Sequence, residues 1–277
     1  RDDLVTGVQT CALPISTGTN NLDKEYLAKR GIEWRNVAGY STETVAQHTF
    51  ALLFYLLEKL RYYDDYVKSE KYVGDTSFTH FSNVFHQISG MTWGIVGLGN
   101  IGRRVADIAK AFGCHVIYYS TSGRNSQPGY ERVDFDTLLA ASDIVSVHAP
   151  LTDDTLGLMD KSAFEKMKKS AIFLNLGRGP IVNETDLAQA LMDGELAAAG
   201  LDVLAQEPMS EDNPLRVIKD SNKLIMFVSF CCNFMLVTFC FITLCFLHYV
   251  LLLFALLHSD CIIAFSYSTH SFIFYFF

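Results

Sequence analysis

Short apolar runs of strand length alternate with segments of helical periodicity between residues 92 and 201. The strand-like runs lie at residues 92–96, 115–119, 143–148, 171–175 and 197–201. The helical segments lie at residues 100–112, 136–141, 161–167 and 183–193, where apolar side chains recur every three or four positions. This alternation is typical of βαβ units around a parallel sheet, and it predicts an α/β fold with a doubly wound sheet.

Polar and glycine residues at the ends of these segments predict where the helices start and stop. Asp136 and Asn183 stand where helix N-caps are expected. Gly113 and Gly194 follow helical segments and are expected to end them, because glycine adopts the left-handed conformation of a helix C-cap.

Upstream of residue 92, the pattern predicts one long helix over residues 41–60. Its wide apolar face consists of Val45, Thr49, Phe50, Leu53, Phe54, Leu57 and Leu60. Before it, residues 22–30 and 32–37 indicate one helix and one strand, which are too few elements for a domain. We interpret them as the end of a domain whose beginning is missing.

The composition changes abruptly at the two ends of the chain. Beyond Lys223, the charged residues Asp, Glu, Lys and Arg are represented only by Asp260. The uncharged run at residues 224–257 exceeds the ~20 residues needed to span a bilayer, but it has neither Gly nor Pro and no flanking Trp. An out-of-frame translation of residues 226–277 is therefore preferred, with a membrane anchor as the alternative.

Residues 5–15 resemble the translation of a sequencing-adapter oligonucleotide, so residues 1–16 are expected to be an artefact rather than part of the fold. The alternative interpretation of this segment is an irregular N-terminal strand.

Charge and cysteine usage narrow the range of partners. The net charge is −8 and no basic stripe occurs, so nucleic acid is not an expected partner. No cysteine or histidine spacing is typical of a metal site, so no metal is expected. Cys114 is the one cysteine between residues 17 and 225, which suits a reducing, cytoplasmic location.

A glycine-rich turn joins the strand at residues 92–96 to the helix that follows. The segment Gly97, Leu98, Gly99, Asn100, Ile101, Gly102 has the spacing of a dinucleotide-binding turn. In such a turn the first glycine permits the tight bend, the second lets the backbone approach a pyrophosphate, and the third lets helix and strand pack closely. Asn100 and Ile101 open the helix whose N-terminus would face the phosphates. The alternative is a glycine turn without a ligand.

The second strand of such a unit usually ends in an acid that binds the adenosine ribose of NAD. Here Ser120 follows the strand and Arg124 lies four residues on, without an acid between them. Hydroxyls and a cation suit the 2′-phosphate of NADP. The alternative is a solvated loop, so NAD and NADP both remain possible cofactors.

Three further motifs follow in order along the chain. They are Val147-His148-Ala149-Pro150-Leu151-Thr152, then Asn175-Leu176-Gly177-Arg178-Gly179, then Gly200-Leu201-Asp202-Val203 with Glu207-Pro208. With the glycine turn, residues 17–225 resemble the D-isomer-specific 2-hydroxyacid dehydrogenases. The resemblance implies a Rossmann domain over residues 39–225, preceded at residues 17–38 by a remnant of a flavodoxin-like substrate domain.

The family resemblance also implies an activity and roles for individual residues. The activity is the NAD(P)-dependent, reversible reduction of a small 2-keto acid to a D-2-hydroxy acid. Arg178 would bind the substrate's carboxylate and keto oxygen, and Glu207 would hydrogen-bond the catalytic histidine and raise its pKa. The residues implied to line the cofactor are His148, Ala149, Pro150 and Asp202. The alternatives are a surface salt bridge for Arg178, a loop acid for Glu207 and a turn former for Asp202.

The catalytic histidine of the family has no counterpart here. Val228 and Ser229 stand where the resemblance expects a Pro-His pair. His48 lies inside the long helix and is expected to be packed or exposed rather than catalytic, and the histidines of the apolar tail, His248, His258 and His270, have no partner pattern. The chain is therefore expected to be inactive.

Two other functions stay open beside the dehydrogenase. One is a dinucleotide-dependent binding protein similar to the transcriptional corepressors that resemble this family, and the other is a protein anchored to a membrane through its tail. The presence of both Arg178 and Glu207 favours the enzyme. The resemblance further implies a homodimer.

Overall fold

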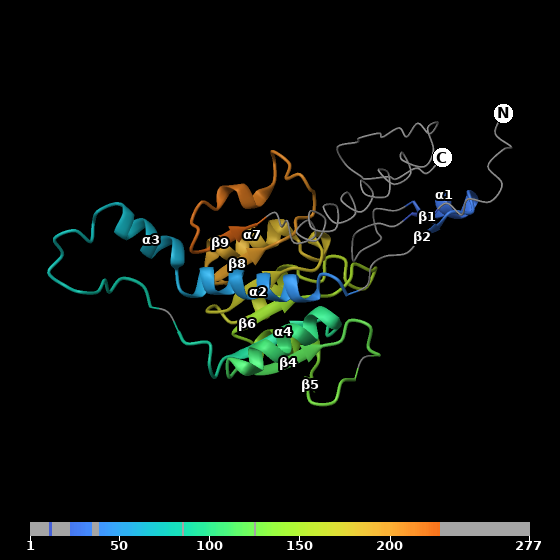
Figure 1. The fold of residues 1–277 in the computed structure, drawn as a ribbon, viewed down its shortest axis with the longest axis horizontal. Coiled ribbons are helices and arrows are strands. Elements are labelled where there is room, and N and C mark those ends of the chain that lie inside the picture. The colour runs from blue at the N-terminus through green and yellow to red at the C-terminus, as the bar shows by residue number, and fades with distance from the viewer. Residues whose placement is uncertain (1–10, 13–22, 35–38, 85, 125, 228–277) are drawn as a thin grey trace, which may run out of the picture. The chain divides into compact units, whose positions relative to one another are not determined.

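The computed structural model describes residues 11–12, 23–34, 39–84, 86–124 and 126–227, and Ser41–Ser229 makes one compact unit (Figure 1). A separate N-terminal unit contains strands β1 (Cys11–Ala12) and β2 (Glu33–Trp34), which pair in parallel, and helix α1 (Lys24–Lys29). The helix and the strand expected before residue 38 are thus present in shortened form.

Seven parallel strands of the described residues form the sheet of the compact unit. They are β3 (Thr92–Val96), β4 (His115–Tyr119), β5 (Glu131–Arg132), β6 (Ile144–Val147), β7 (Ile172–Asn175), β8 (Ala198–Leu201) and β9 (Leu224–Met226). Their order is β5-β4-β3-β6-β7-β8-β9. The first six strands have the order of a doubly wound, dinucleotide-binding sheet, which confirms the predicted fold class. The switch point lies between β3 and β6.

Helices cover both faces of this sheet. One layer contains α2 (Thr42–Leu57) and α4 (Asn100–Ala111), and the other contains α5 (Phe135–Ala141), α6 (Lys161–Lys166) and α7 (Glu184–Asp193). Two short 3-10 turns, η1 (Gly179–Ile181) and η2 (Pro214–Val217), follow β7 and precede β9. Strands β6, β7 and β8 form nearly continuous apolar runs because both of their faces are buried.

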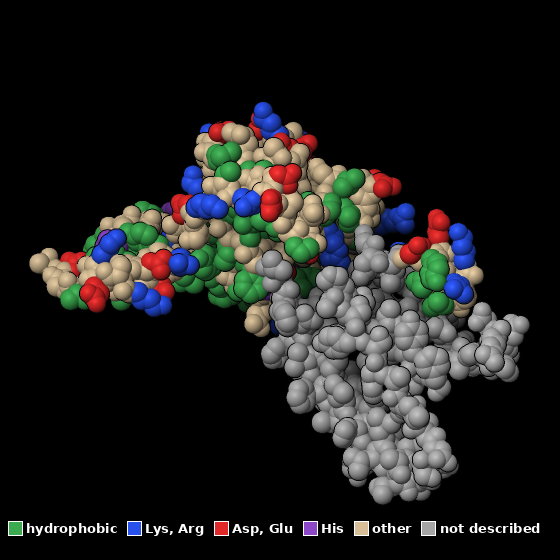
Figure 2. Space-filling view, turned by 90° about the horizontal axis from the view of Figure 1, so that it is seen from above, with side chains coloured by type: hydrophobic (Ala, Val, Ile, Leu, Met, Phe, Trp, Pro, Cys, Tyr) green, Lys and Arg blue, Asp and Glu red, His purple; other side chains and the backbone are tan. Residues whose placement is uncertain are grey.

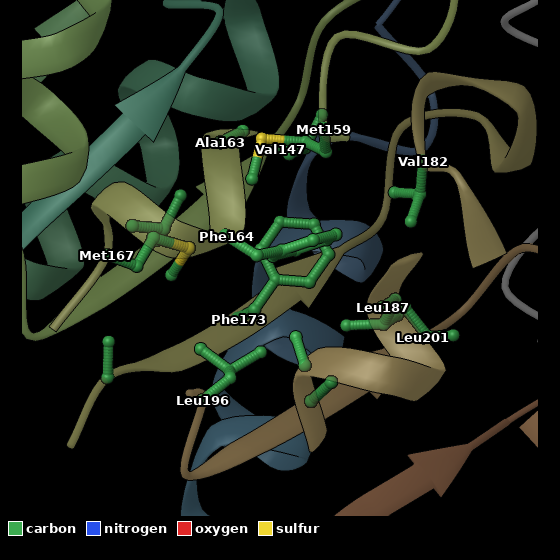
Figure 3. Close-up of a cluster of buried hydrophobic side chains, with 14 of the residues drawn as sticks. Val147, Met159, Ala163, Phe164, Met167, Phe173, Val182, Leu187, Leu196 and Leu201 are labelled. Atoms are coloured by element: carbon green, nitrogen blue, oxygen red, sulfur yellow. The ribbon is translucent and has the colours of Figure 1, made fainter. Parts of the chain in front are cut away.

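The sheet separates two hydrophobic cores, one on each of its faces. In β6, Ile144 belongs to the core under α2 and α4, whereas Val145 and Val147 belong to the core under α5, α6 and α7. In the second core, the ring of Phe164 from α6 meets that of Phe173 from β7 edge to face, with centroids 5.5 Å apart (Figure 3). Such aromatic pairs add about 0.5–1.5 kcal/mol to the burial of their area.

The long helix predicted at residues 41–60 is wrong in one respect. The helix α2 ends at Leu57, Lys59 takes a left-handed conformation with φ of 55°, and a second helix, α3 (Leu60–Lys68), starts immediately after it. Leu60, expected on the apolar face, is 47% exposed because the break turns the chain away. The apolar pattern continued through a break that neither glycine nor proline marks.

The predicted caps are confirmed except for one. Asn183 accepts hydrogen bonds from the N–H groups of Thr185 and Asp186, and Gly194 ends α7 with φ of 72°. Gly113, with φ of 85°, follows α4 as expected. The N-cap of α5, however, is Asp134, which accepts from the N–H of Thr137 at 2.9 Å. Asp136 instead lies in the first turn, where its carboxylate pairs with Lys166 at 2.7 Å.

No helix among the described residues is long and apolar enough to cross a membrane. Nor does any group of three or more His, Cys, Asp or Glu in the described part of the chain have the arrangement of a metal site. Residues 1–10 and 228–277 lie outside the described residues, and with them most of the segments expected to be foreign to the fold.

Candidate cofactor and substrate site

The glycine turn lies at the carboxyl end of β3, where two of its glycines are required by the chain itself. Gly97 has φ of +92°, and a Cβ placed on it would lie 2.9 Å from the backbone of Ala149. Its N–H donates to the backbone oxygen of Tyr119 at 3.0 Å, which ties the turn to β4. A Cβ on Gly102 would overlap the backbone oxygen of Gly97, so only glycine lets α4 pack this closely.

Gly99 differs from both. Its φ of −81° is open to other residues, and a Cβ placed on it would meet no atom within 4 Å. No side chain caps α4, for which Gly99 is the N-cap residue, so the first N–H groups of the helix are available to an anion. The space beside Gly99 fits the close approach of a pyrophosphate.

The next two residues of the turn start helix α4. Asn100 is exposed, and its side-chain oxygen accepts a hydrogen bond from Arg103 on the next turn of the helix. Ile101 is partly buried and packs against the core under α2 and α4. Asn100 therefore faces solvent at the predicted phosphate site, while Ile101 anchors the helix.

Ala149 connects the glycine turn to the loop that carries Arg178. It is buried directly after β6, against Gly97 on one side, and its backbone oxygen would lie 2.9 Å from a Cβ placed on Gly177 on the other. The carboxyl ends of β3, β6 and β7 thus pack backbone against backbone. Pro150, which follows, is exposed.

The loop after β7 is braced from within by Asn175. The side-chain amide of Asn175 donates to the backbone oxygen of Arg178 at 3.1 Å, and its side-chain oxygen accepts from the N–H of Gly177 at 3.1 Å. Arg178 itself is partly exposed, and its Nη1 donates to the oxygen of Gly177 at 2.8 Å. The brace holds the backbone from which the guanidinium projects at the ligand edge of the sheet.

Glu207 lies in the loop after β8, which packs on the Arg178 loop. A Cβ on Gly179 would overlap the backbone of Leu204, so the two loops touch without intervening side chains. Glu207 is exposed, and its Oε1 accepts from the N–H of Leu204 at 2.8 Å. From α7, Glu184 accepts from the N–H of Ala205 at 2.7 Å and fixes the same loop. The sequence did not reveal this second carboxylate.

Two successive hydrogen bonds inside the sheet hold His148 in place. The indole N–H of Trp93 donates to Ser146 Oγ at 2.8 Å, and Ser146 Oγ lies 3.1 Å from His148 Nε2. The other ring nitrogen, Nδ1, is buried without a hydrogen-bond partner among the described residues. Burial lowers the pKa of His148 to about 3, so the ring is neutral at physiological pH. It cannot serve as an acid there.

Asp202 follows β8 directly and lies near a residue that the sequence did not connect with it. The Nε2 atom of His48, in α2, lies 3.6 Å from Asp202 Oδ1. His48 is packed, as one of the two expectations had it, and burial lowers its pKa. His48 and Asp202 are 154 positions apart in the chain, so no local sequence pattern indicates that they lie together.

The residues expected at the adenosine end follow β4. Ser120 is buried, and its backbone oxygen accepts from the N–H of Gly123 at 3.1 Å. Arg124 is exposed, and its own N–H donates to Ser122 Oγ at 3.3 Å. Ser120 is thus buried in the fold, whereas Arg124 lies on a solvent-exposed turn.

Comparison with known proteins identifies the family. Residues 50–226 match the family model described as D-isomer specific 2-hydroxyacid dehydrogenase, NAD binding domain. The chain belongs to the D-isomer specific 2-hydroxyacid dehydrogenases, which confirms the resemblance found in the motifs. The expected cofactor, NAD or NADP, is also confirmed for this domain.

Relatives of defined activity and structure share this region. A glyoxylate reductase of Aeropyrum pernix is 38% identical over 210 residues, covering 74% of this chain and 63% of the relative. The crystal structure of D-lactate dehydrogenase from Aquifex aeolicus, complexed with NAD and lactic acid, has a TM-score of 0.70 at 26% identity and covers 84% of this chain and 76% of that one. An acyclic imino acid reductase (Bsp5), in complex with NADPH and D-Arg, has a TM-score of 0.70 at 28% identity and covers 81% and 71%. The chain thus spans less than two thirds of the length of the glyoxylate reductase.

Proposed function

We propose that the protein to which this chain belongs reduces a small 2-keto acid to the D-2-hydroxy acid, with NADH or NADPH bound at the Gly97–Gly102 turn. The observation that carries the proposal is the position of Ala149. Its backbone packs against both Gly97 and Gly177, so the phosphate-binding turn and the Arg178 loop share one edge of the sheet. Cofactor and substrate can therefore meet there.

The cofactor would lie across the switch point between β3 and β6. Its pyrophosphate would take the space beside Gly99 and the free N–H groups at the start of α4. His148, Ala149 and Pro150 would line the middle of the cofactor, and the neutral ring of His148 adds no charge there. When bound, the nicotinamide supplies or accepts the hydride.

Arg178 is proposed to bind the substrate's carboxylate and keto oxygen. A guanidinium suits this role because its planar fork binds a carboxylate through two parallel hydrogen bonds and keeps its proton. The Asn175 brace supports the role, since it fixes the backbone of Arg178 before any substrate arrives. A positively charged group near the keto oxygen also stabilises the negative charge that develops there during hydride transfer.

Glu207 is proposed to orient a histidine that moves the proton to or from the substrate oxygen. Its Oε1 is engaged by the N–H of Leu204, so the carboxylate is held in position by its own loop. A neighbouring negative charge raises the pKa of an imidazole and favours its protonated, acidic form. That histidine has no counterpart at Val228 or Ser229.

The proposed substrates are two- and three-carbon 2-keto acids. The names of the relatives support this class, because one is a glyoxylate reductase and another was solved with lactic acid. The carboxylate and the keto oxygen that Arg178 would recognise are shared by all acids of this class.

We also propose a homodimer and a cytoplasmic location. Exposed apolar side chains gather on α3 and the segment that follows it, at the left of Figure 2. Phe78, Phe81 and Val84 are 92%, 88% and 80% exposed, and a second copy of the chain could cover them. The free thiol of buried Cys114 suits a reducing compartment.

Binding of oxamate, an unreactive analogue of a 2-keto acid, tests the role of Arg178. The chain loaded with NADH should bind oxamate, and Arg178→Gln should weaken this binding by about tenfold or more, because a charged hydrogen-bonded pair is lost. Arg216→Gln, which alters an exposed arginine of η2, is the matched control. Equal affinities of the Arg178 variant and the control would contradict the proposal.

A further inference from the structure

His48 and Asp202 connect helix α2 to the carboxyl end of β8. Their side chains are 13% and 7% exposed, with 3.6 Å between Nε2 and Oδ1. The N–H of Asp202 donates to the backbone oxygen of Asn175 at 3.0 Å, which fixes the backbone of Asp202 beside the end of β7, the strand that precedes Arg178. An imidazole and a carboxylate are thus held together at the ligand edge of the sheet.

The pair belongs to the nicotinamide half of the proposed site. In a doubly wound sheet each half of the dinucleotide lies over one set of three strands, on either side of the switch point. Ser120 and Arg124 follow β4, so β3, β4 and β5 make the adenosine half. The remaining set, β6, β7 and β8, makes the nicotinamide half, and Asp202 follows β8.

We propose that protonation of His48, beside Asp202, lets the nicotinamide half of the site distinguish the oxidised from the reduced cofactor by charge. The inference rests on the proposed function. The oxidised nicotinamide ring carries one positive charge and the reduced ring carries none. A proton on His48 adds a second positive charge beside Asp202, which opposes the oxidised ring, so the proton and the oxidised cofactor compete.

The other charged groups on the elements around His48 pair elsewhere or are exposed. In α3, Arg61 pairs with Asp65 and Lys68 with Asp64, each at 2.7 Å. Strands β7, β8 and β9 carry no titratable side chain within their spans. On α2, Glu43 pairs with Arg104 of α4 at 2.8 Å. In α4, Arg103 bonds to Asn100, Asp107 to Tyr130, and Lys110 to the oxygen of Gly129. At the α2–α3 junction, Lys59 bonds to the oxygen of Asn222, and Glu58 is exposed to solvent.

Phe227 covers the imidazole. Its ring centroid lies 4.7 Å from that of His48, and its N–H donates to the oxygen of Leu201 at 2.8 Å, which fixes the backbone of Phe227 directly after β9. Burial lowers the pKa of His48, so the ring is neutral at pH 7 and takes up its proton only as the pH falls. Affinity for the oxidised cofactor should therefore fall on acidification.

The dissociation constants of NAD⁺ and NADH, measured by calorimetry on the full chain between pH 8 and pH 5, test this inference. NAD⁺ binding should weaken by about three- to tenfold more than NADH binding, and His48→Gln should remove the difference. His115→Gln is the matched control, because His115 is exposed at the opposite, amino end of β4 and pairs with Glu131 at 3.3 Å. It should leave the difference intact.

A second measurement does not depend on a variant at His48. In the NMR titration of the His48 ring, NAD⁺ should lower the pKa of His48 below its value with NADH, and Asp202→Asn should lower it in the free protein. Identical pH profiles for the two cofactors, or a difference that survives His48→Gln, overturn this inference alone. If neither cofactor binds the folded chain, the proposed function fails and this inference fails with it.

Discussion

The side-chain amide of Asn175 donates a hydrogen bond to the backbone oxygen of Arg178, three residues further along the chain, while its oxygen accepts from Gly177. Asn175 is buried at the end of β7, so loss of its amide leaves both backbone groups without their partner. Asn175→Ala should lower the free energy of unfolding by about 1–3 kcal/mol, the usual cost of leaving buried polar groups unpaired.

Denaturant unfolding followed by circular dichroism measures this effect. Gln189→Ala is the control, because Gln189 is an exposed amide that bonds Asp193 on the same helix. It should change stability by less than about 0.5 kcal/mol. A loss of stability for Asn175→Ala no larger than that of the control would show that the brace contributes nothing.

Valine at two glycines of the phosphate-binding turn should separate cofactor binding from folding. Gly102→Val should lower the free energy of unfolding by about 1–3 kcal/mol, because its Cβ would overlap the oxygen of Gly97. Gly99→Val should cost less than about 1 kcal/mol, since its Cβ meets no atom, yet it should abolish cofactor binding. Thermal unfolding and NADH fluorescence titration measure the two effects. Unchanged NADH affinity in the Gly99 variant would contradict the pyrophosphate position.

Cofactor preference should not lie strongly with NAD, because no acid follows β4 to repel a 2′-phosphate. Arg124→Ala should weaken NADPH binding by about five- to tenfold and leave NADH binding unchanged. Ser120→Asp should shift the preference towards NADH, although Ser120 is buried and the variant must first be shown to fold. A wild-type preference for NADH of a hundredfold, about 2.7 kcal/mol, is the result that would rule this out.

The unaltered chain should not reduce 2-keto acids at ordinary enzyme rates. General acid catalysis is worth about 10²- to 10⁴-fold, and no histidine stands at Val228 or Ser229 to provide it. Val228→Pro with Ser229→His, a family-like C-terminal helix and a complete substrate domain from a relative should restore glyoxylate or pyruvate reduction, measured as NADH oxidation. Reduction by the unaltered chain at such rates would require another proton donor.

In the restored enzyme, Glu207→Gln provides a further check. Loss of the neighbouring negative charge disfavours imidazolium and lowers the pKa of the new histidine. The alkaline limb of keto-acid reduction should therefore move to lower pH. An unchanged pH profile would exclude Glu207 from the role proposed for it.

Acid should destabilise the fold through His148. Burial lowers the pKa of this histidine to about 3, below its unfolded value near 6.5, so the unfolded chain binds a proton that the native chain does not. The contribution of the neutral ring to the free energy of unfolding is fully present above about pH 6.5 and is lost as the pH falls towards 3. Between pH 7 and pH 4 the loss should be about 1–3 kcal/mol, moderated because part of the residue remains accessible.

Denaturant midpoints at the two pH values measure this loss. His148→Gln removes the titrating ring and should flatten the pH dependence, whereas His115→Gln, at an exposed histidine, should leave it as in the wild type. Equal slopes for all three proteins would mean that His148 is protonated as easily in the native as in the unfolded state.

Local sequence patterns predicted the sheet and the cofactor turn, because their causes are local. The Gly97–Gly102 spacing, the apolar runs and the Asn183 and Gly194 caps each act within a few residues. The break at Lys59 was not predictable, because a left-handed lysine carries no compositional mark. The short strand β5 was also missed, since its two residues are charged and exposed.

At the site, the sequence indicated Arg178 and Glu207 but not what holds them. The Glu207–Leu204 bond forms within one irregular loop, and the Glu184 contact to the same loop depends on how α7 packs behind the strand ends. The proximity of His48 to Asp202 depends on a helix that precedes β3 in the sequence yet lies across strands formed much later. Such relationships become visible only when the tertiary packing is known.

That position of α2 has a consequence during synthesis. The helix packs against β7, β8 and β9, the last of which ends at Met226, whereas the helix itself is complete at Leu57. At about 5–20 residues per second, a ribosome needs roughly 8 to 35 seconds to make the intervening chain. Throughout that interval the apolar face of α2 lacks its final strands, and this is the period in which a chaperone would have most to protect.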